Sequence, residues 1–442
     1  MYGKDVSALL DKHGIRVGDT ILLLAGPERY EGVLMPRVDV GDSSIIVIKR
    51  KDGYNMGIKY HAGMKIHKLA AGKGEFEFPT AGAEHSRSLD TVSLIYTGGT
   101  IGSKVDYRTG GVYMLTKPQE LLYEVPELQD IANIHVSNLM SIASEDMTCT
   151  EWKKIGREVA GAFNAGSKGV MITHGTDTMH YTSAALSFML QGLNGPVVLT
   201  GAQRSSDRGS SDAFMNLICA SHIAAKSDVA EVGICMHSTP SDNTCSLIRG
   251  VKARKLHTSR RDAFRPVNGS PIATVDIGGA IDYKSKYRKA SKHKSRVSLL
   301  DGFEEKTALV KFYPNSDPGI IDFYLGKGYR GIILEGTGLG HVAVSPSRSE
   351  LSWISRIKDA ASSGAVVGMT SQCLYGRVNS AVYRNLRMAA DAGAVYCEDM
   401  MPEVAYVKLG FLLGNYGEKK AREMLPVDIA GEITKRTEYT EG

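Results

Sequence analysis

The sequence predicts an α/β protein with a large doubly wound domain, a smaller α/β domain after it, and a small SH3-like or Sm-like β-barrel before it. Three observations lead to this prediction. From about residue 91, short apolar runs alternate with amphipathic helical stretches, which is typical of parallel sheets covered by helices on both faces. The first 75 residues instead contain closely spaced strand-like runs. A basic stretch at 284–296 interrupts the alternation.

Length and composition agree with a globular chain of several domains. Its 442 residues suggest two or three domains, and 43% apolar with 23% charged residues are ordinary for a protein with a real core. We divide the chain into a barrel (1–75), a linker (76–90), a large domain (91–283), a basic linker (284–306) and a smaller domain (307–442). No run of about 18 apolar residues and no apolar leader is found, so we expect a cytoplasmic protein.

The six cysteines lie far apart, and none forms a Cys-x-x-Cys pair. We therefore expect reduced thiols and no metal site. The formal net charge of +5 is mild for this length, so it permits an acidic partner without predicting one.

The expected barrel begins with a short helix at 6–13, followed by five strand-like runs separated by turn residues. These strands are predicted at 20–24, 30–34, 45–48, 54–60 and 64–69. Small barrels of this kind usually bind a partner rather than catalyse. The alternative is an appendage that merely packs on the main body.

The two α/β domains are expected to alternate strands with helices. In the large domain, strands are predicted at 92–96, 169–173, 196–200 and 232–236. Helices are predicted at 152–163, 179–192 and 211–225, the first of them starting at the capping box Thr148-Cys149-Thr150-Glu151. In the smaller domain, strands are predicted at 308–312, 331–334, 365–369 and 394–397.

Two of the predicted strands end in similar polar motifs. Thr97-Gly98-Gly99-Thr100-Ile101 follows the first strand, and Thr173-His174-Gly175-Thr176-Asp177-Thr178 follows the second. Open α/β sheets hold their ligands at the carboxyl ends of their strands, so both motifs point to one site. Together they resemble the two signature motifs of the bacterial-type L-asparaginase/glutaminase family, and the resemblance covers residues from about 90 to 430. It implies an asparaginase-like fold and hydrolysis of a side-chain amide through a threonine nucleophile.

The resemblance also implies roles for single residues. Thr97 corresponds to the attacking hydroxyl, and Thr176, Asp177 and Lys255 form a second group that handles protons. Lys255 is identified by the Arg-x-Lys core of its segment and the trailing Asp-Ala-Phe at 262–264. A lysine accepts a proton near neutral pH only where burial and positive neighbours favour its uncharged form. Thr97 and Thr176 both remain candidates for the first nucleophile.

A tyrosine on a mobile lid after the first motif is expected to activate the nucleophile. The polar segment 103–111 ends in a glycine pair that suits a hinge, and it contains Tyr107. Tyr113 is the alternative lid residue. The alternative for Tyr107 is an ordinary exposed loop aromatic.

Ser144 and Glu145 are expected to bind the α-amino and α-carboxylate groups of the substrate, because they match the family's segment with this role. Ser144 would donate to the α-carboxylate, while Glu145 and Asp177 would hold the α-ammonium. Backbone N–H groups at Gly98 and Thr176 are candidate donors to the oxyanion. Glu145 departs from the family, which has glutamine there, so preference between glutamine and asparagine stays open.

His174 is also a candidate for the general base. The family's histidine at this place is structural, so we expect a scaffold residue.

The chain places about 90 residues ahead of the first motif, where family members generally begin. The chain resembles the archaeal tRNA-dependent amidotransferases, which convert Glu-tRNA(Gln) to Gln-tRNA(Gln). The resemblance rests on this amino-terminal extension, on Glu145 and on the segment around Lys255. The resemblance implies an amidase that supplies ammonia to a partner, the E subunit of glutamyl-tRNA amidotransferase, which would carry ATP and Mg²⁺. The present chain would need no cofactor, and it contains no Gly-x-x-x-x-Gly-Lys-Ser/Thr loop. The family further implies a homodimer.

Two other interpretations remain. One is a stand-alone cytosolic L-asparaginase with an unrelated amino-terminal domain. The other is a non-enzymatic ligand-binding protein whose first motif holds a phosphate, although Glu145 and Asp177 would place carboxylates near that phosphate. The basic stretch at 284–296 is predicted as a solvated linker, with contact to tRNA phosphate as the alternative.

Overall fold

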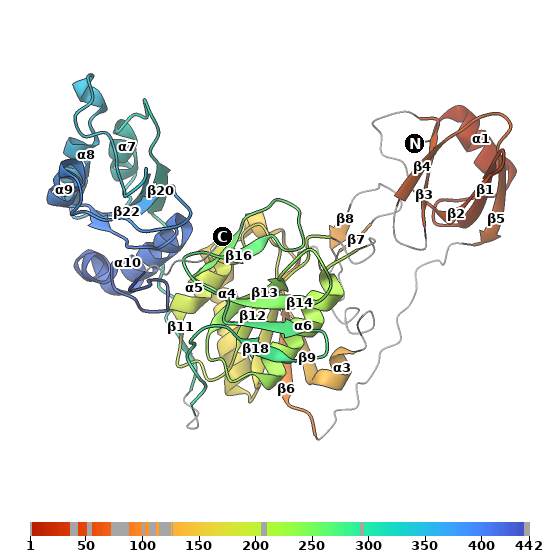
Figure 1. Cartoon of the computed structure of the whole chain (residues 1–442), viewed down its shortest axis with the longest axis horizontal. Coiled ribbons are helices and arrows are strands. Elements are labelled where there is room, and N and C mark those ends of the chain that lie inside the picture. The colour runs from red at the N-terminus through yellow and green to blue at the C-terminus, as the bar shows by residue number, and fades with distance from the viewer. Residues whose placement is uncertain are drawn as a thin grey trace.

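The computed structural model describes residues 2–35, 43–50, 55–71, 88–99, 101, 103–105, 112–114, 125, 127–204, 210–291 and 296–436. Figure 1 shows an amino-terminal sheet in red, a large domain in yellow and green, and a small domain in blue. None of the helices in this described part is long and apolar enough to cross a membrane. All six cysteines are free thiols, and only Cys373 is exposed.

The amino-terminal region is a five-stranded antiparallel sheet preceded by helix α1 (Lys4–Lys12). The strands are β1 (Thr20–Ala25), β2 (Glu28–Leu34), β3 (Ile45–Lys49), β4 (Asn55–Lys59) and β5 (Lys65–Ala70), in the order β4-β3-β2-β1-β5. Alternate residues such as Ile21 and Leu23 of β1 are fully buried and pack with Val6 and Leu10 of the helix. All five predicted strands are confirmed. Closure into a barrel stays a prediction, because β4 and β5 form the two edges of the sheet in the part described.

The large domain is built on an eight-stranded sheet in the order β18-β17-β14-β13-β12-β10-β6-β9. Five strands run parallel: β6 (Thr91–Tyr96), β9 (Asn133–Asn138), β10 (Gly169–Thr173), β12 (Val197–Thr200) and β13 (Val232–His237). Three antiparallel strands extend it: β14 (Thr244–Arg249), β17 (Ala273–Asp276) and β18 (Ile281–Tyr283). The sheet is therefore mixed, whereas we predicted a parallel one. Four strands of this sheet were not predicted: the parallel edge strand β9 and the antiparallel strands β14, β17 and β18. Strands β17 and β18 are only partly buried, and β9 has no fully buried residue.

The order of the parallel strands fixes where a ligand binds. In chain order, β9-β6-β10-β12-β13 reads 2-1-3-4-5, so the chain changes direction across the sheet between β6 and β10. Doubly wound sheets bind ligands in the crevice at this switch point, outside the carboxyl ends of the strands. The two polar motifs predicted as the site follow these two strands.

Helices cover both faces of the large sheet, as predicted. Helices α4 (Cys149–Asn164) and α5 (Met179–Met189) cover one face, while α3 (Leu128–Ile131) and α6 (Ala213–Lys226) cover the other. The predicted capping box starts α4, since Thr148 Oγ1 accepts from Thr150 N at 3.2 Å and Glu151 accepts from Thr148 N at 3.1 Å.

The small domain has a four-stranded parallel sheet in plain chain order. Its strands are β20 (Thr307–Lys311), β21 (Gly331–Gly336), β22 (Val366–Ser371) and β23 (Val395–Tyr396), which confirms the four predicted strands. Its helices are α7 (Gly319–Gly326), α8 (Trp353–Ser362), α9 (Arg384–Asp391) and α10 (Pro402–Met424). Helix α10 packs on α5 of the large domain as well as on its own sheet, and so joins the two domains (Figure 1).

Short elements complete the described part. They are the hairpin β7 (Ser103–Val105) and β8 (Val112–Met114), the pair β11 (Leu190–Gln191) and β19 (Ser298–Leu299), the hairpin β15 (Ala253–Lys255) and β16 (Phe264–Pro266), and the 3₁₀ turns η2 (Ser144–Asp146) and η3 (Ser349–Leu351).

The predicted basic linker is packed on the large domain over its first half. Ala230 N donates to Arg288 O at 2.8 Å, and Ala290 N donates to Asp228 O at 2.7 Å. Lys289 pairs with Asp228, and Lys284 pairs with Asp282. The backbone here follows the large domain rather than running free, and part of its positive charge is paired. Residues 292–295 lie outside the described part.

Candidate active site

The turns that follow β6 and β10 lie against each other. Thr97 N donates to Thr173 O at 3.3 Å, and Gly98 and Gly99 have φ angles of 111° and 90°, in the left-handed region that favours glycine. A Cβ atom on Gly99 would lie 2.6 Å from Gly175 N, so no side chain fits there. The two predicted motifs therefore lie against each other at the switch point.

Thr97 is the first residue after β6. Its side chain is fully buried, and its Oγ1 donates to Thr173 O at 2.7 Å. A backbone carbonyl can hold the hydroxyl in place, but it is not a base that removes the proton. Activation of Thr97 therefore requires a further group.

Thr176, Asp177 and Lys255 form a continuous polar chain. Lys255 Nζ donates to Thr176 Oγ1 at 2.8 Å and to Asp177 Oδ1 at 2.7 Å. The lysine side chain is nearly buried at 10% exposure, whereas the aspartate side chain is 68% exposed. A hydroxyl, an amine and a carboxylate in line generalise the serine triad, in which a base is oriented by an acid. The structure thus brings together the three residues that the sequence assigned to one group.

The β15–β16 hairpin carries Lys255 at its end. Lys255 pairs with Phe264 in the antiparallel register, and Phe264 is buried in the core. In the connecting loop, Asp262 is also buried and accepts from Arg260 Nε and Nη2 at 2.9 and 2.7 Å. The Asp-Ala-Phe segment that identified the lysine therefore anchors its hairpin.

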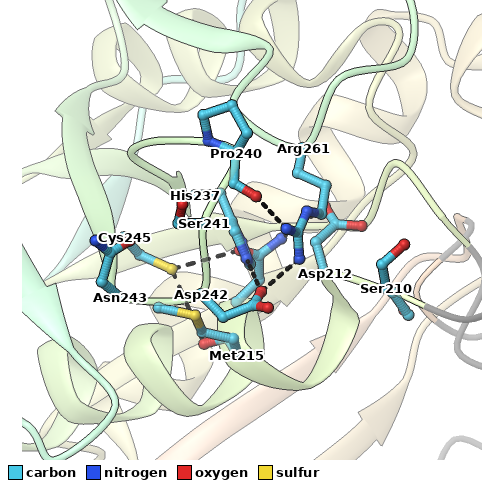
Figure 2. Close-up of polar contacts among 12 residues, drawn as sticks. Ser210, Asp212, Met215, His237, Pro240, Ser241, Asp242, Asn243, Cys245 and Arg261 are labelled. Atoms are coloured by element: carbon cyan, nitrogen blue, oxygen red, sulfur yellow. Dashed lines mark hydrogen bonds and ion pairs between the residues drawn. The ribbon is translucent and has the colours of Figure 1, made fainter.

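A second anchor holds the same loop to the end of β13. Figure 2 shows Arg261 reaching the carbonyl oxygen of Pro240 and the carboxylate of Asp242. Asp242 Oδ1 lies 3.1 Å from Nε2 of the buried His237, whose Nδ1 lies 2.6 Å from Asn216 Oδ1 on α6. The loop after Lys255 is thus tied to the sheet and to a helix. We did not predict this network, because its members are scattered along the sequence.

His174 is a scaffold residue, as expected. Burial lowers the pKa of its imidazole to about 4, so the ring is neutral at neutral pH. Its Nδ1 lies 2.6 Å from Gly175 O and its Nε2 lies 2.8 Å from Thr182 Oγ1. With both ring nitrogens bound inside the protein, the ring fixes the turn before Thr176.

The predicted head-binding segment lies against the second motif. A Cβ atom on Gly175 would lie 2.8 Å from Ser144 Oγ, and Thr178 Oγ1 donates to Ser144 O at 2.6 Å. Ser144 is buried, and the exposed Glu145 follows it in η2. Sequence reasoning missed the contribution of Thr178, although its place at the end of the motif was a usable signal.

The lid tyrosine is not placed. Tyr107 lies outside the described residues, and of Tyr113 only the backbone is described, in β8 opposite Lys104 of β7. Both stay predictions. Over the described ranges, no group of three or more His, Cys, Asp or Glu side chains could hold a metal ion.

Comparison with protein families gives three matches. Residues 91–289 match the asparaginase N-terminal family, and residues 306–425 match the glutaminase/asparaginase C-terminal domain. Residues 15–69 match the GatD N-terminal domain. The amino-terminal region, the large domain and the small domain therefore each match a known protein family.

Curated relatives cover almost the whole chain. The D subunit of glutamyl-tRNA(Gln) amidotransferase from Pyrococcus furiosus is 48% identical over 440 residues, which is 98% of this chain and 98% of that protein. The protein of the same name from Thermococcus kodakarensis is 46% identical over 444 residues, covering 99% and 98%.

Solved structures resemble the two α/β domains. The thermostable L-asparaginase from Thermococcus kodakarensis matches with a TM-score of 0.70 and 29% identity, over 78% of this chain and 100% of that one. L-asparaginase I from Vibrio cholerae matches with a TM-score of 0.67 and 28% identity, over 78% and 99%. The asparaginase-like fold predicted from the two motifs is confirmed.

Proposed function

The chain belongs to the family of glutamyl-tRNA(Gln) amidotransferase D subunits, and we propose that it releases ammonia from the side-chain amide of glutamine or asparagine for the conversion of Glu-tRNA(Gln) to Gln-tRNA(Gln). The observation that carries the chemistry is the contact of Lys255 Nζ with both Thr176 Oγ1 and Asp177 Oδ1. A buried amine held between a hydroxyl and a carboxylate is suited to moving a proton.

Hydrolysis needs two successive attacks on one carbonyl carbon. In the first, a threonine hydroxyl attacks the amide, the proton passes to the departing nitrogen, and ammonia leaves a threonyl ester. In the second, water attacks the ester and releases the acid. Thr97 and Thr176 follow the neighbouring parallel strands β6 and β10, so both hydroxyls lie near the same edge of the sheet. We assign the first attack to Thr97 and the proton transfers to Thr176, Lys255 and Asp177.

The substrate is held by its amino-acid head. Ser144 lies against the turn that carries Thr176, which places it beside the proposed nucleophiles. Its hydroxyl can donate a hydrogen bond to the α-carboxylate of the substrate. Glu145 and the exposed Asp177 supply negative charge for the α-ammonium. We assign donation to the oxyanion to the backbone N–H groups of Gly98 and Thr176.

The ammonia is consumed elsewhere. Activation of the glutamate carboxyl on tRNA requires ATP and Mg²⁺, which we assign to a partner, the E subunit of glutamyl-tRNA amidotransferase, together with the tRNA site. The present chain acts through its own side chains and carries no cofactor in this proposal. We further propose a homodimer that binds this partner in the cytoplasm.

A two-part assay tests the proposal. Ammonia release is measured from glutamine and from asparagine, with and without the E subunit, ATP, Mg²⁺ and Glu-tRNA(Gln). We expect the complete mixture to raise the turnover of the amidase strongly and to form Gln-tRNA(Gln). Full turnover of asparagine by the chain alone, unchanged by these additions, would instead identify a stand-alone asparaginase.

The order of attack is read from the covalent intermediate. Rapid quenching of the reaction followed by mass spectrometry is expected to detect an acyl group on a peptide containing Thr97. An acyl group on the Thr176 peptide would reverse the assignment.

A further inference from the structure

The strand that carries the site lysine is also bound on its other side. Arg254 precedes Lys255 in β15, and successive side chains of a strand point in opposite directions. Lys255 reaches Thr176 and Asp177, while Arg254 Nε lies 3.0 Å from Glu403 Oε1. Glu403 lies in the first turn of α10, so this contact comes from the small domain.

Glu403 is held in a largely dry environment. Its side chain is 4% exposed, and burial raises the pKa of its carboxyl. Its other basic neighbour, His180, has Nε2 4.0 Å from Glu403 Oε1. Burial, with the positive charges of Arg254 and other neighbours, lowers the pKa of His180 to about 4. His180 is therefore neutral at neutral pH, and Arg254 is the positively charged side chain within 4.0 Å of Glu403 among the described residues.

The contact is an ion pair by distance, while Glu403 Oε1 makes no hydrogen bond in the part of the chain described. An ion pair between distant parts of a chain can hold a short strand through charge attraction. Strand β15 is three residues long and pairs only with β16 in the part of the chain described. Its residues are held from one side by Thr176 and Asp177 and from the other by Glu403, which is 149 residues further along the chain than Arg254. Displacement of a reacting group by about 1 Å can cost about 10²-fold in rate.

We propose that Glu403 and Arg254 are positioning residues: through their ion pair, helix α10 of the small domain fixes strand β15 and thereby holds Lys255 Nζ between Thr176 and Asp177. The proposal rests on the amidase function proposed above. It extends that function by giving the small domain a direct part in the geometry of the site.

The test compares variants that remove or keep the two charges, in the full-length chain in its complex with the E subunit. Glu403→Gln removes the charge and keeps the shape, and we expect kcat for amide hydrolysis to fall about 10- to 100-fold, as for a misplaced reacting group, with KM changed by less than about two-fold. Arg254→Gln is expected to cause the same loss. Arg254→Lys keeps the charge and is expected to recover most of the activity.

The double variant shows whether the two residues act as one. If Glu403 works through Arg254, then Arg254→Gln/Glu403→Gln has a kcat no lower than the worse single variant. A loss equal to the product of the two single losses would overturn the proposal. An unchanged kcat in Glu403→Gln would overturn it as well.

A neighbouring interdomain ion pair provides a matched control. Lys252 Nζ lies 2.8 Å from Asp399 Oδ2, both side chains are almost completely buried, and Lys252 is three residues before Lys255. We expect Asp399→Asn to lower the unfolding temperature while the folded enzyme keeps its kcat. An equal loss of kcat in Asp399→Asn would show that any interdomain contact suffices, and would refute a specific role for Glu403.

Folding and function are checked separately. Circular dichroism and unfolding temperature establish that each variant is folded, and Arg254, one-third exposed, is the more tolerant site if Glu403→Gln unfolds. Absence of amidase activity in the unaltered complex would contradict the proposed function itself, not the positioning role.

Discussion

In the part of the chain that the structure describes, two sheets contain parallel strands and have helices on both faces, but the strand order reverses only in the large sheet. In the large sheet the chain order reads 2-1-3-4-5 across its parallel strands, so the order reverses between β6 and β10, where doubly wound sheets bind their ligands. In the small sheet the order is β20-β21-β22-β23, without reversal. The predicted catalytic threonines lie at the reversal. Strand order, more than strand composition, therefore locates the chemistry.

The largest expected effect comes from substitutions at the reversal of strand order in the large sheet. Thr97→Ala, Thr176→Ala and Lys255→Met each remove a reacting group, and we expect kcat/KM to fall about 10³-fold or more. Thr200 ends β12, one strand away from the crevice, and its hydroxyl donates to Cys235 O inside the core. Thr200→Val is the matched control and should keep kcat/KM within about five-fold. Equal losses in the control would show that strand order does not locate the site.

The small domain is expected to respond in stability rather than in chemistry. Lys408 on α10 and Glu432 are both fully buried, with Nζ and Oε1 2.5 Å apart. Glu432→Gln leaves the lysine charge without its counter-ion, which should lower the free energy of unfolding by about 3–5 kcal/mol. Urea denaturation measures this loss. The double variant Lys408→Met/Glu432→Met should recover most of it, and a single variant as stable as the wild type would contradict the prediction.

A third prediction concerns how the stability of the large domain depends on pH through His174. His174 is neutral in the folded state with a pKa of about 4, while the unfolded chain has the ordinary value of about 6.5. Its contribution to stability is therefore complete above about pH 6.5 and is lost as the pH falls towards 4, amounting to about 3 kcal/mol. Unfolding measured between pH 7 and 4 should show a smaller slope in His174→Gln. His135→Gln, at an exposed site on β9, is the control and should keep the wild-type slope.

The smallest expected effect concerns the region outside both α/β sheets. The amino-terminal sheet has its own core and stands apart from the large domain in Figure 1. Removal of residues 1–75 should leave kcat for amide hydrolysis within about two-fold, because separate domains fold independently. The same truncation tests partner binding by size-exclusion chromatography with the E subunit. A large loss of amidase activity would show that the first domain contributes to the site.

Much of this architecture was readable in the sequence. The strands that carry the site are continuous apolar runs ending in hydroxyls and glycines, so local pattern was sufficient for β6 and β10. Strands β9, β14, β17 and β18 were not predicted. They mix polar with apolar residues, and their pairing depends on tertiary contacts.

The residues of the candidate site likewise include some that the sequence revealed and some that it did not. Lys255 was identified by family resemblance, because no periodicity connects residues 79 positions apart in the sequence. The ion pair between Arg254 and Glu403 joins two domains, and neither the resemblance nor the local pattern revealed it. The packing of the basic stretch against Asp228 was hidden for the same reason, since composition alone describes a solvated linker.

The contact of the two glycine turns has a further consequence for how the protein acquires activity. The backbone of Gly99 rests directly on that of Gly175, so the turns interlock only when β6 and β10 are paired in the native register. A slip of one residue would turn every side chain of β6 to the opposite face and drive the loops into collision. We therefore expect a molecule in which these strands are misaligned to release no ammonia until β6 and β10 have paired in the native register.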